Sequence, residues 1–233
     1  VKSAGYHTVE IISNATLFTD AAIKTIVEEN LLARILISID GATKEMFESI
    51  RGTDFDNFLK NVKMLTDYKR ACNARYPEMI FNAVCMKKNL HELPMLMDLA
   101  HELHIDAIYF VHLNAITLDK LNLEYQDKIC TSDQRLDQCD RAEVVDIFRR
   151  IDEKSKKYDI RYNPPENYLG EPAPATSRSD NAPRKTACSV PYQWVQVTES
   201  GNVHPCCQIS KRYSLGNLKQ NTFDEIWNSD KFI

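Results

Sequence analysis

Apolar and polar positions along the first two thirds of the chain predict strands that alternate with helices. Four segments have the length and β-branched content of strands: 8–12, 34–39, 79–85 and 107–113. Segment 34–39 is almost continuously apolar, which is typical of a parallel strand covered on both faces. Strands and helices that alternate at this spacing predict an α/β fold with a parallel sheet and crossover connections.

Helical spacing of apolar residues predicts the segments that connect these strands. The first helix begins near Asp20, whose side chain can cap it. Two helices over 43–50 and 55–65 follow the second strand, and a helix over 93–103 precedes the fourth strand. A further helix covers 141–158, after a polar stretch that predicts irregular structure.

The last quarter of the chain has a different pattern. Residues 163–185 contain five prolines, which predicts an extended linker. Residues 192–205 predict a hairpin that turns at 198–201, and residues 222–232 predict a short helix. We therefore expect three parts: a partial α/β domain over 1–160, a linker over 161–185 and a small cysteine-rich domain over 186–233.

Composition and charge restrict the function classes. The net charge of −4 argues against a broad nucleic-acid-binding face, and 43% hydrophobic residues suffice for a globular core. No segment approaches the roughly 18 consecutive apolar residues of a membrane span, and residues 1–5 lack the apolar core of a signal peptide. Seven cysteines, two of them adjacent, suit reduced thiols or metal ligands better than disulfides. We expect a cytoplasmic protein that binds neither nucleic acid nor membranes.

Polar side chains follow the predicted strands where each one ends. They are Asn14, Ser38 with Asp40, Asn82 and His112. Ligands of parallel α/β folds bind at the carboxyl ends of the strands, so these side chains predict a polar binding pocket. Each of these residue types also favours turns and helix caps, so each by itself is a weak indicator.

Arg51 ends the short helix that follows Asp40-Gly41. An arginine at this position can fold back over the strand ends and bind a carboxylate through its guanidinium fork. Taken alone, a solvent-exposed charge is the simpler interpretation.

Three cysteines gather in the C-terminal domain. Cys188, Cys206 and Cys207 lie in a segment with few apolar residues, and small domains often depend on a bound metal. Thiolates bind zinc or iron–sulfur clusters. Cys206 and Cys207 would point to opposite faces of an extended strand, and His204 would complete a zinc site of mixed ligands.

Three segments resemble the radical S-adenosylmethionine enzymes that carry a C-terminal SPASM or twitch domain. "EIISNATLF" (10–18) is similar to the third barrel strand of that family, although Ser-Asn-Ala stands where Thr-Asn-Gly is common. "ISIDGATKEMFESIRG" (37–52) is similar to the fourth strand and the helix behind it. "ACSVPYQWVQVTESGNVHPCCQ" (187–208) resembles the start of a SPASM domain, with the family's spacing of cysteine, glycine and cysteine.

The resemblance implies a fold and a set of cofactors. The fold is a partial parallel (β/α)6-type barrel followed by a SPASM-like domain. A [4Fe–4S] cluster would reduce S-adenosylmethionine to a 5′-deoxyadenosyl radical, which abstracts a substrate hydrogen, for example in peptide or protein modification. A flavodoxin or ferredoxin would supply the electron.

The resemblance also assigns roles to residues of this sequence. Four residues would contact S-adenosylmethionine or line its pocket: Asn14, Ser38, Asp40 and Arg51. Cys188 and Cys206 would bind an auxiliary iron–sulfur cluster, with Cys207 as a further candidate metal ligand. No catalytic residue is assigned.

Two family motifs are missing from the sequence. Cys-x-x-x-Cys-x-x-Cys, which holds the radical-generating cluster, occurs nowhere in the 233 residues, and neither does the Gly-Gly-Glu segment of the second strand. We therefore expect that the chain starts near the third barrel strand, stops inside the SPASM domain and cannot generate the radical alone.

Two other functions are compatible with the residues. One is a non-redox binding or scaffold protein with a structural zinc site of Cys188, His204, Cys206 and Cys207. The other is an ordinary α/β enzyme in which Asp40 and His112 act as acid and base. The sequence specifies neither the substrate nor the number of auxiliary clusters nor the oligomeric state.

Overall fold

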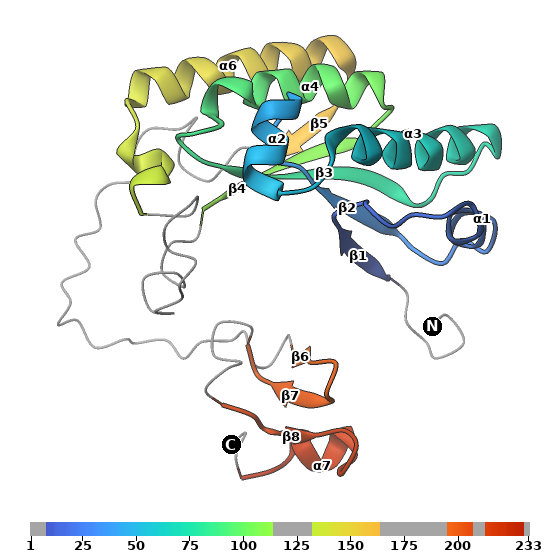
Figure 1. Ribbon diagram of the computed structural model, residues 1–233. Helices are drawn as coiled ribbons and strands as arrows, with labels where there is room; N and C mark the ends of the chain where they lie inside the picture. The colour runs from blue at the N-terminus through green and yellow to red at the C-terminus, as the bar shows by residue number, and fades with distance from the viewer. Residues whose placement is uncertain (1–7, 114–131, 164–194, 207–212, 231–233) are drawn as a thin grey trace, which may run out of the picture. The chain divides into compact units, whose positions relative to one another are not determined.

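A computed structural model describes residues 8–113, 132–163, 195–206 and 213–230 of the chain (Figure 1). The chain divides into two compact units, Val1–Ala175 and Thr176–Ile233, and each is described by itself. Most of the predicted linker, 164–185, lies outside the described residues.

The first unit is built on a five-stranded sheet in the order β1-β2-β3-β4-β5, and every neighbouring pair is parallel. The strands are β1 (Glu10–Ser13), β2 (Arg34–Ser38), β3 (Glu78–Cys85), β4 (Ala107–His112) and β5 (Arg161–Asn163). The predicted parallel α/β fold is therefore confirmed. The sequence had placed residues 161–163 in the linker, but they pair with 107–109 of β4. Three residues are too few to show a strand periodicity, so only this pairing reveals β5.

Helices connect the strands, and side-chain caps fix where they begin. The α-helices are α1 (Asp20–Glu28), α2 (Lys44–Arg51), α3 (Phe55–Ala71), α4 (Leu93–Glu102) and α6 (Arg141–Tyr158). Short 3-10 turns are η2 (Leu90–Glu92), η3 (Ser132–Gln134) and η4 (Leu136–Gln138). Thr19, rather than the predicted Asp20, caps α1, because its hydroxyl accepts the Ala22 N–H at 3.2 Å. No helix in the described ranges is long and apolar enough to cross a membrane.

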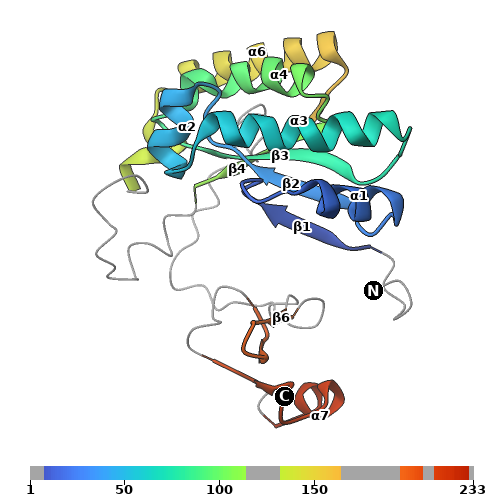
Figure 2. The same ribbon diagram turned by 45° about the vertical axis from the view of Figure 1, so that its right-hand side comes forward.

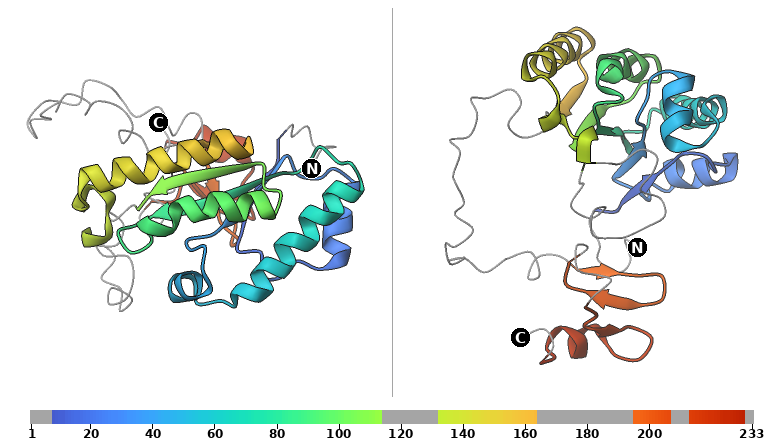
Figure 3. Two further views of the ribbon diagram at one scale, coloured as in Figure 1. Left: turned by 90° about the horizontal axis from the view of Figure 1, so that it is seen from above. Right: turned by 60° about the vertical axis from the view of Figure 1, so that its left-hand side comes forward.

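The helices lie on one face of the sheet (Figures 2 and 3). Side chains of alternate strand residues, such as Ile37, Phe81 and Phe110, are fully buried against them. The intervening residues of β2, Leu36 and Ser38, are only partly buried. Within the described residues, the second face of β2 is thus less covered than its apolar sequence had predicted.

The second unit is a small antiparallel sheet with one helix. Its elements are β6 (Gln196–Val197), β7 (Asn202–His204), β8 (Gly216–Asn217) and α7 (Phe223–Trp227). The β6–β7 pair confirms the predicted hairpin, and Gly201 occupies its turn at φ 89°. The sequence missed β8 and extended α7 to 232. Val203, Leu215 and Ile226 form the small core of this unit.

Candidate cofactor site and cluster domain

Polar side chains lie together at the carboxyl edge of the parallel sheet. Ser38, the last residue of β2, is in register with Asn82 of β3. Partners in a parallel register point to the same face, and here both side chains are partly buried on the face away from the helices. Within the described ranges, neither side chain forms a hydrogen bond with the protein. The amide and hydroxyl are therefore available to a ligand.

Asp40 and Arg51 form a buried ion pair at the same edge. Asp40 is 4% exposed, and its Oδ1 accepts the Val84 N–H at 2.7 Å. The Arg51 Nε atom lies 2.8 Å from the Asp40 Oδ2 atom, but its N–H does not point along that line as a hydrogen bond requires. Burial raises the pKa of Asp40 above its usual value, and the Arg51 charge and the Val84 N–H oppose that shift.

This arrangement leaves most of the Arg51 guanidinium available. The side chain is 26% exposed, and Asp40 is its only polar partner in the described part of the chain. A guanidinium has five N–H groups, so the terminal nitrogens remain free to bind an anion.

The position of Arg51 depends on how the chain enters α2. The buried Glu92 carboxylate accepts the backbone N–H groups of Ala42 at 2.7 Å and Thr43 at 3.0 Å. It also accepts the Thr43 hydroxyl at 2.7 Å. Gly41 fits because a Cβ atom there would lie 2.5 Å from the Phe47 backbone nitrogen. Local sequence does not reveal the role of Glu92, since an acidic residue before a helix usually indicates a solvent-exposed cap.

Asn14 follows β1 and His112 ends β4, two strands that β2 and β3 separate in the sheet. The exposed Asn14 side chain accepts the Thr16 N–H at 3.2 Å and the Thr16 hydroxyl at 2.9 Å, so its carbonyl oxygen stabilises a turn. His112 ends β4 in register with Cys85 and is exposed. Because Val84 and Arg51 already occupy the Asp40 carboxylate, the geometry disfavours the acid–base pair of Asp40 and His112.

In the second unit, the structure describes part of the predicted metal site. Cys206 follows β7 and is partly buried. His204 is buried, and its Nδ1 donates to the Tyr213 carbonyl at 2.7 Å. Cys188 and Cys207 lie outside the described residues. Among the residues that are described, no three metal-binding side chains come together.

Comparison with known proteins extends these observations. A family model described as SPASM, an iron–sulfur cluster-binding domain, matches residues 188–233. The chain is 27% identical over 162 residues to a probable GTP 3′,8-cyclase of Sulfurisphaera tokodaii, covering 70% of this chain and 47% of that protein. A probable GTP 3′,8-cyclase of Saccharolobus islandicus is 24% identical over 172 residues, which is 73% of this chain and 51% of that protein. The chain thus spans about half the length of the curated relatives it matches.

Solved structures share the fold. SuiB of Streptococcus suis bound to S-adenosylmethionine has a TM-score of 0.64 at 15% identity, over 95% of this chain and 48% of that one. SuiB bound to its precursor peptide SuiA has a TM-score of 0.63 at 14% identity, over 96% and 48%. Native anSMEcpe with bound AdoMet has a TM-score of 0.60 at 16% identity, over 97% and 58%.

Residues 188–233 match the SPASM domain, and the chain is similar in sequence to probable GTP 3′,8-cyclases and in fold to proteins solved with S-adenosylmethionine, which supports the predicted resemblance to radical S-adenosylmethionine enzymes. The predicted fold class is confirmed, and the match to a cluster-binding domain supports the predicted iron–sulfur cluster. Because the matching domain is described as cluster-binding, the zinc alternative is disfavoured.

Proposed function

We propose that this chain binds S-adenosylmethionine as part of an enzyme that abstracts a hydrogen atom from a peptide or protein. Reductive cleavage of the bound sulfonium would supply the 5′-deoxyadenosyl radical that such chemistry requires. The observation that carries this proposal is the Arg51 guanidinium, which the buried Asp40 holds at the carboxyl edge of the sheet. Ligands of open parallel folds bind at that edge.

The side chains at this edge fit S-adenosylmethionine. Its methionyl carboxylate matches the free fork of Arg51 in charge and shape. Ser38 and Asn82 offer a hydroxyl and an amide to the ribose and amino groups of the cofactor. Asn14 would contribute its amide N–H groups from the neighbouring turn. Asp40 accepts the Val84 N–H with one oxygen and faces the Arg51 charge with the other, so we assign it the task of positioning Arg51.

The cysteines would hold an auxiliary cluster in the second unit. Cys188 and Cys206 are the proposed ligands, and Cys207 is a third candidate. The Cys-x-x-x-Cys-x-x-Cys motif is absent from the 233 residues. We infer that this chain alone does not cleave S-adenosylmethionine, and that a flavodoxin or ferredoxin reduces the complete enzyme.

Two substrate classes compete. SuiB, which shares the fold, has been captured with a precursor peptide, and this supports a peptide substrate. The curated relatives are named for a reaction of GTP, and this supports a nucleotide. Supplying each class separately to the enzyme decides between them, because only a true substrate gives a modified product of altered mass.

The proposal is tested on the complete product of the gene that encodes this chain, purified without oxygen. We expect the purified protein to contain bound iron and sulfide. After addition of dithionite and S-adenosylmethionine, we expect 5′-deoxyadenosine, which mass spectrometry detects. Arg51→Gln should weaken S-adenosylmethionine binding about tenfold or more, because a charge-assisted contact is lost. The matched control is Arg150→Gln on the exposed face of α6, which should bind normally. A purified protein that holds no iron, or equal S-adenosylmethionine affinity of Arg51→Gln and Arg150→Gln, would refute the proposed function.

A further inference from the structure

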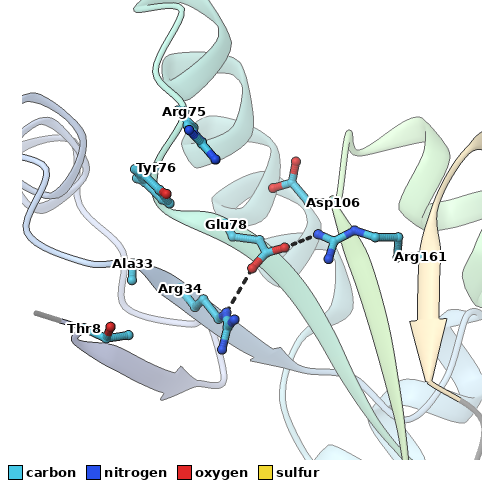
Figure 4. A pocket seen from close by; sticks show the side chains of 8 residues that line it. All are labelled: Thr8, Ala33, Arg34, Arg75, Tyr76, Glu78, Asp106 and Arg161. Carbon is cyan, nitrogen blue, oxygen red and sulfur yellow. Dashed lines mark hydrogen bonds and ion pairs between the residues drawn. The ribbon is translucent and has the colours of Figure 1, made fainter.

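A second pocket lies at the opposite, amino-terminal edge of the parallel sheet (Figure 4). Its volume is about 520 Å³, within the range of roughly 300–1,000 Å³ that is usual for small-molecule sites. Side chains from the starts of all five strands contribute to it. The lining residues are Thr8, Ala33, Arg34, Arg75, Tyr76, Glu78, Asp106 and Arg161. Nothing in the S-adenosylmethionine site uses these residues.

Both carboxylates of the pocket are already neutralised. Glu78 lies between two arginines (Figure 4) and accepts from Arg34 Nε at 3.0 Å and from Arg161 Nη2. Asp106 Oδ2 accepts from Lys69 Nζ and from the Met79 backbone N–H, each at 2.7 Å. Neither acid is therefore an uncompensated negative charge that would repel an anion.

The pocket has an excess of N–H donors. Arg34 uses Nε and Nη1, the latter on Glu10 at 2.6 Å, which leaves Nη2 free. Arg161 uses Nη2 only, which leaves Nε and Nη1. Arg75 lies 5.3 Å from the centre of the Tyr76 ring and, within the described residues, has no acidic partner. Each guanidinium carries five N–H groups, so the three arginines offer many unused donors.

The net charge around the pocket also favours an anion. Arg34, Arg75, Arg161 and Lys69 are four cations, and Glu10, Glu78 and Asp106 are three acids, so one positive charge remains. That charge belongs to Arg75, which lines the pocket and is exposed. Arginine forks match the oxygens of phosphate groups in spacing and direction.

We propose that this amino-edge pocket binds an oligophosphate, either inorganic or carried by a nucleoside. Arg75 supplies the unpaired charge, and the free N–H groups of Arg34 and Arg161 bind further phosphate oxygens. The Tyr76 ring, 38% exposed, stands beside the phosphate position and is available to stack against a base. The site is independent of the function proposed for the opposite edge.

Isothermal titration of the 233-residue chain tests the proposal, with pyrophosphate and ADP as separate ligands at constant ionic strength. We expect one site for pyrophosphate. Arg75→Gln should weaken it about tenfold or more, and Arg75→Lys should weaken it less, because lysine keeps the charge but loses the fork. Arg150→Gln removes an exposed arginine outside the pocket and should leave the affinity unchanged.

Circular dichroism of each variant separates a lost site from lost folding. If ADP binds more tightly than pyrophosphate and Tyr76→Leu removes that difference, the ligand is an oligophosphate carried by a nucleoside. If the two affinities are equal, the ligand is an inorganic oligophosphate. No heat of binding for either ligand, or equal weakening by Arg75→Gln and Arg150→Gln, would overturn the proposal.

Discussion

Replacing Glu92 by alanine should destabilise the first unit more than any surface substitution. The Glu92 side chain is 5% exposed and holds the entry to α2 through three hydrogen bonds, two from backbone N–H groups and one from the Thr43 hydroxyl. Alanine leaves the N–H groups of Ala42 and Thr43 without their acceptor. It also removes a negative charge from the N-terminus of a helix, where the helix dipole favours one.

The size of the effect follows from these contacts. A buried donor that loses its partner costs about 1–3 kcal/mol. Two such donors and the lost dipole interaction, less the cost of burying the carboxylate, give about 3 kcal/mol for Glu92→Ala. Glu92→Gln keeps an acceptor oxygen for the two N–H groups, and its amide can donate to the Thr43 hydroxyl. We therefore expect only about 1 kcal/mol for Gln.

Urea unfolding of the chain, followed by circular dichroism, measures both variants. Glu102→Ala is the matched control, because Glu102 ends the following helix and is exposed. It should change the free energy of unfolding by less than about 0.5 kcal/mol. If Glu92→Ala costs no more than Glu92→Gln, the carboxylate does not hold α2, and our account of how Arg51 is positioned is wrong.

Four further substitutions, of which Gly52→Ala is a control, test the packing and the ion pairing around the sheet. Gly41→Ala brings a Cβ atom to 2.5 Å from the Phe47 nitrogen, so it should lower the free energy of unfolding in urea by about 2 kcal/mol or more. At Gly52 a Cβ atom would have no atom within 4 Å, so Gly52→Ala should cost only about 1 kcal/mol, which comes from its positive φ. Asn61→Ala should cost about 2 kcal/mol by the same assay, since it leaves the Ala15 carbonyl without its donor at 2.9 Å. Partial burial raises the pKa of Glu78, but hydrogen bonds from two arginines outweigh it and lower that pKa below 4.5. The ionised Glu78 carboxylate contributes stability that is present above pH 4.5 and is lost as pH falls through the lowered pKa. The loss in free energy of unfolding caused by Glu78→Gln should therefore shrink in acid. A loss that grows in acid would contradict the pairing of Glu78 with the two arginines.

Periodicity predicted the first four strands because each has a continuous or alternating apolar pattern that the sheet requires. Segment 34–39 is the clearest case, since Ile35 and Ile37 are fully buried in β2. The short strands β5 and β8 escaped prediction, because two or three residues hold no period and only pairing with a neighbour defines them.

The candidate site could be predicted in its composition but not in its contacts. Ser38 and Arg51 were found because strand ends and helix ends are readable in the sequence. The different roles of Asp40 and Arg51 could not be predicted, because they depend on the Val84 N–H, which belongs to another strand 44 residues later. Long-range partners of this kind leave no local pattern. The assignment of Cys188, Cys206 and Cys207 remains a prediction.

The two edges of the sheet use the same residue pair, arginine and carboxylate, for different purposes. At the carboxyl edge the Asp40 side chain is 6% exposed and the Arg51 side chain 26%, so water screens their attraction little. At the amino edge Arg34 is 42% and Arg161 72% exposed, and such pairs contribute about 0–1 kcal/mol each. A buried pair therefore suits the cofactor contact that we propose for Arg51, whereas an exposed network can exchange its partners for an incoming anion. The fold thus places a buried ion pair at the end where chemistry is proposed and exposed, exchangeable ion pairs at the other.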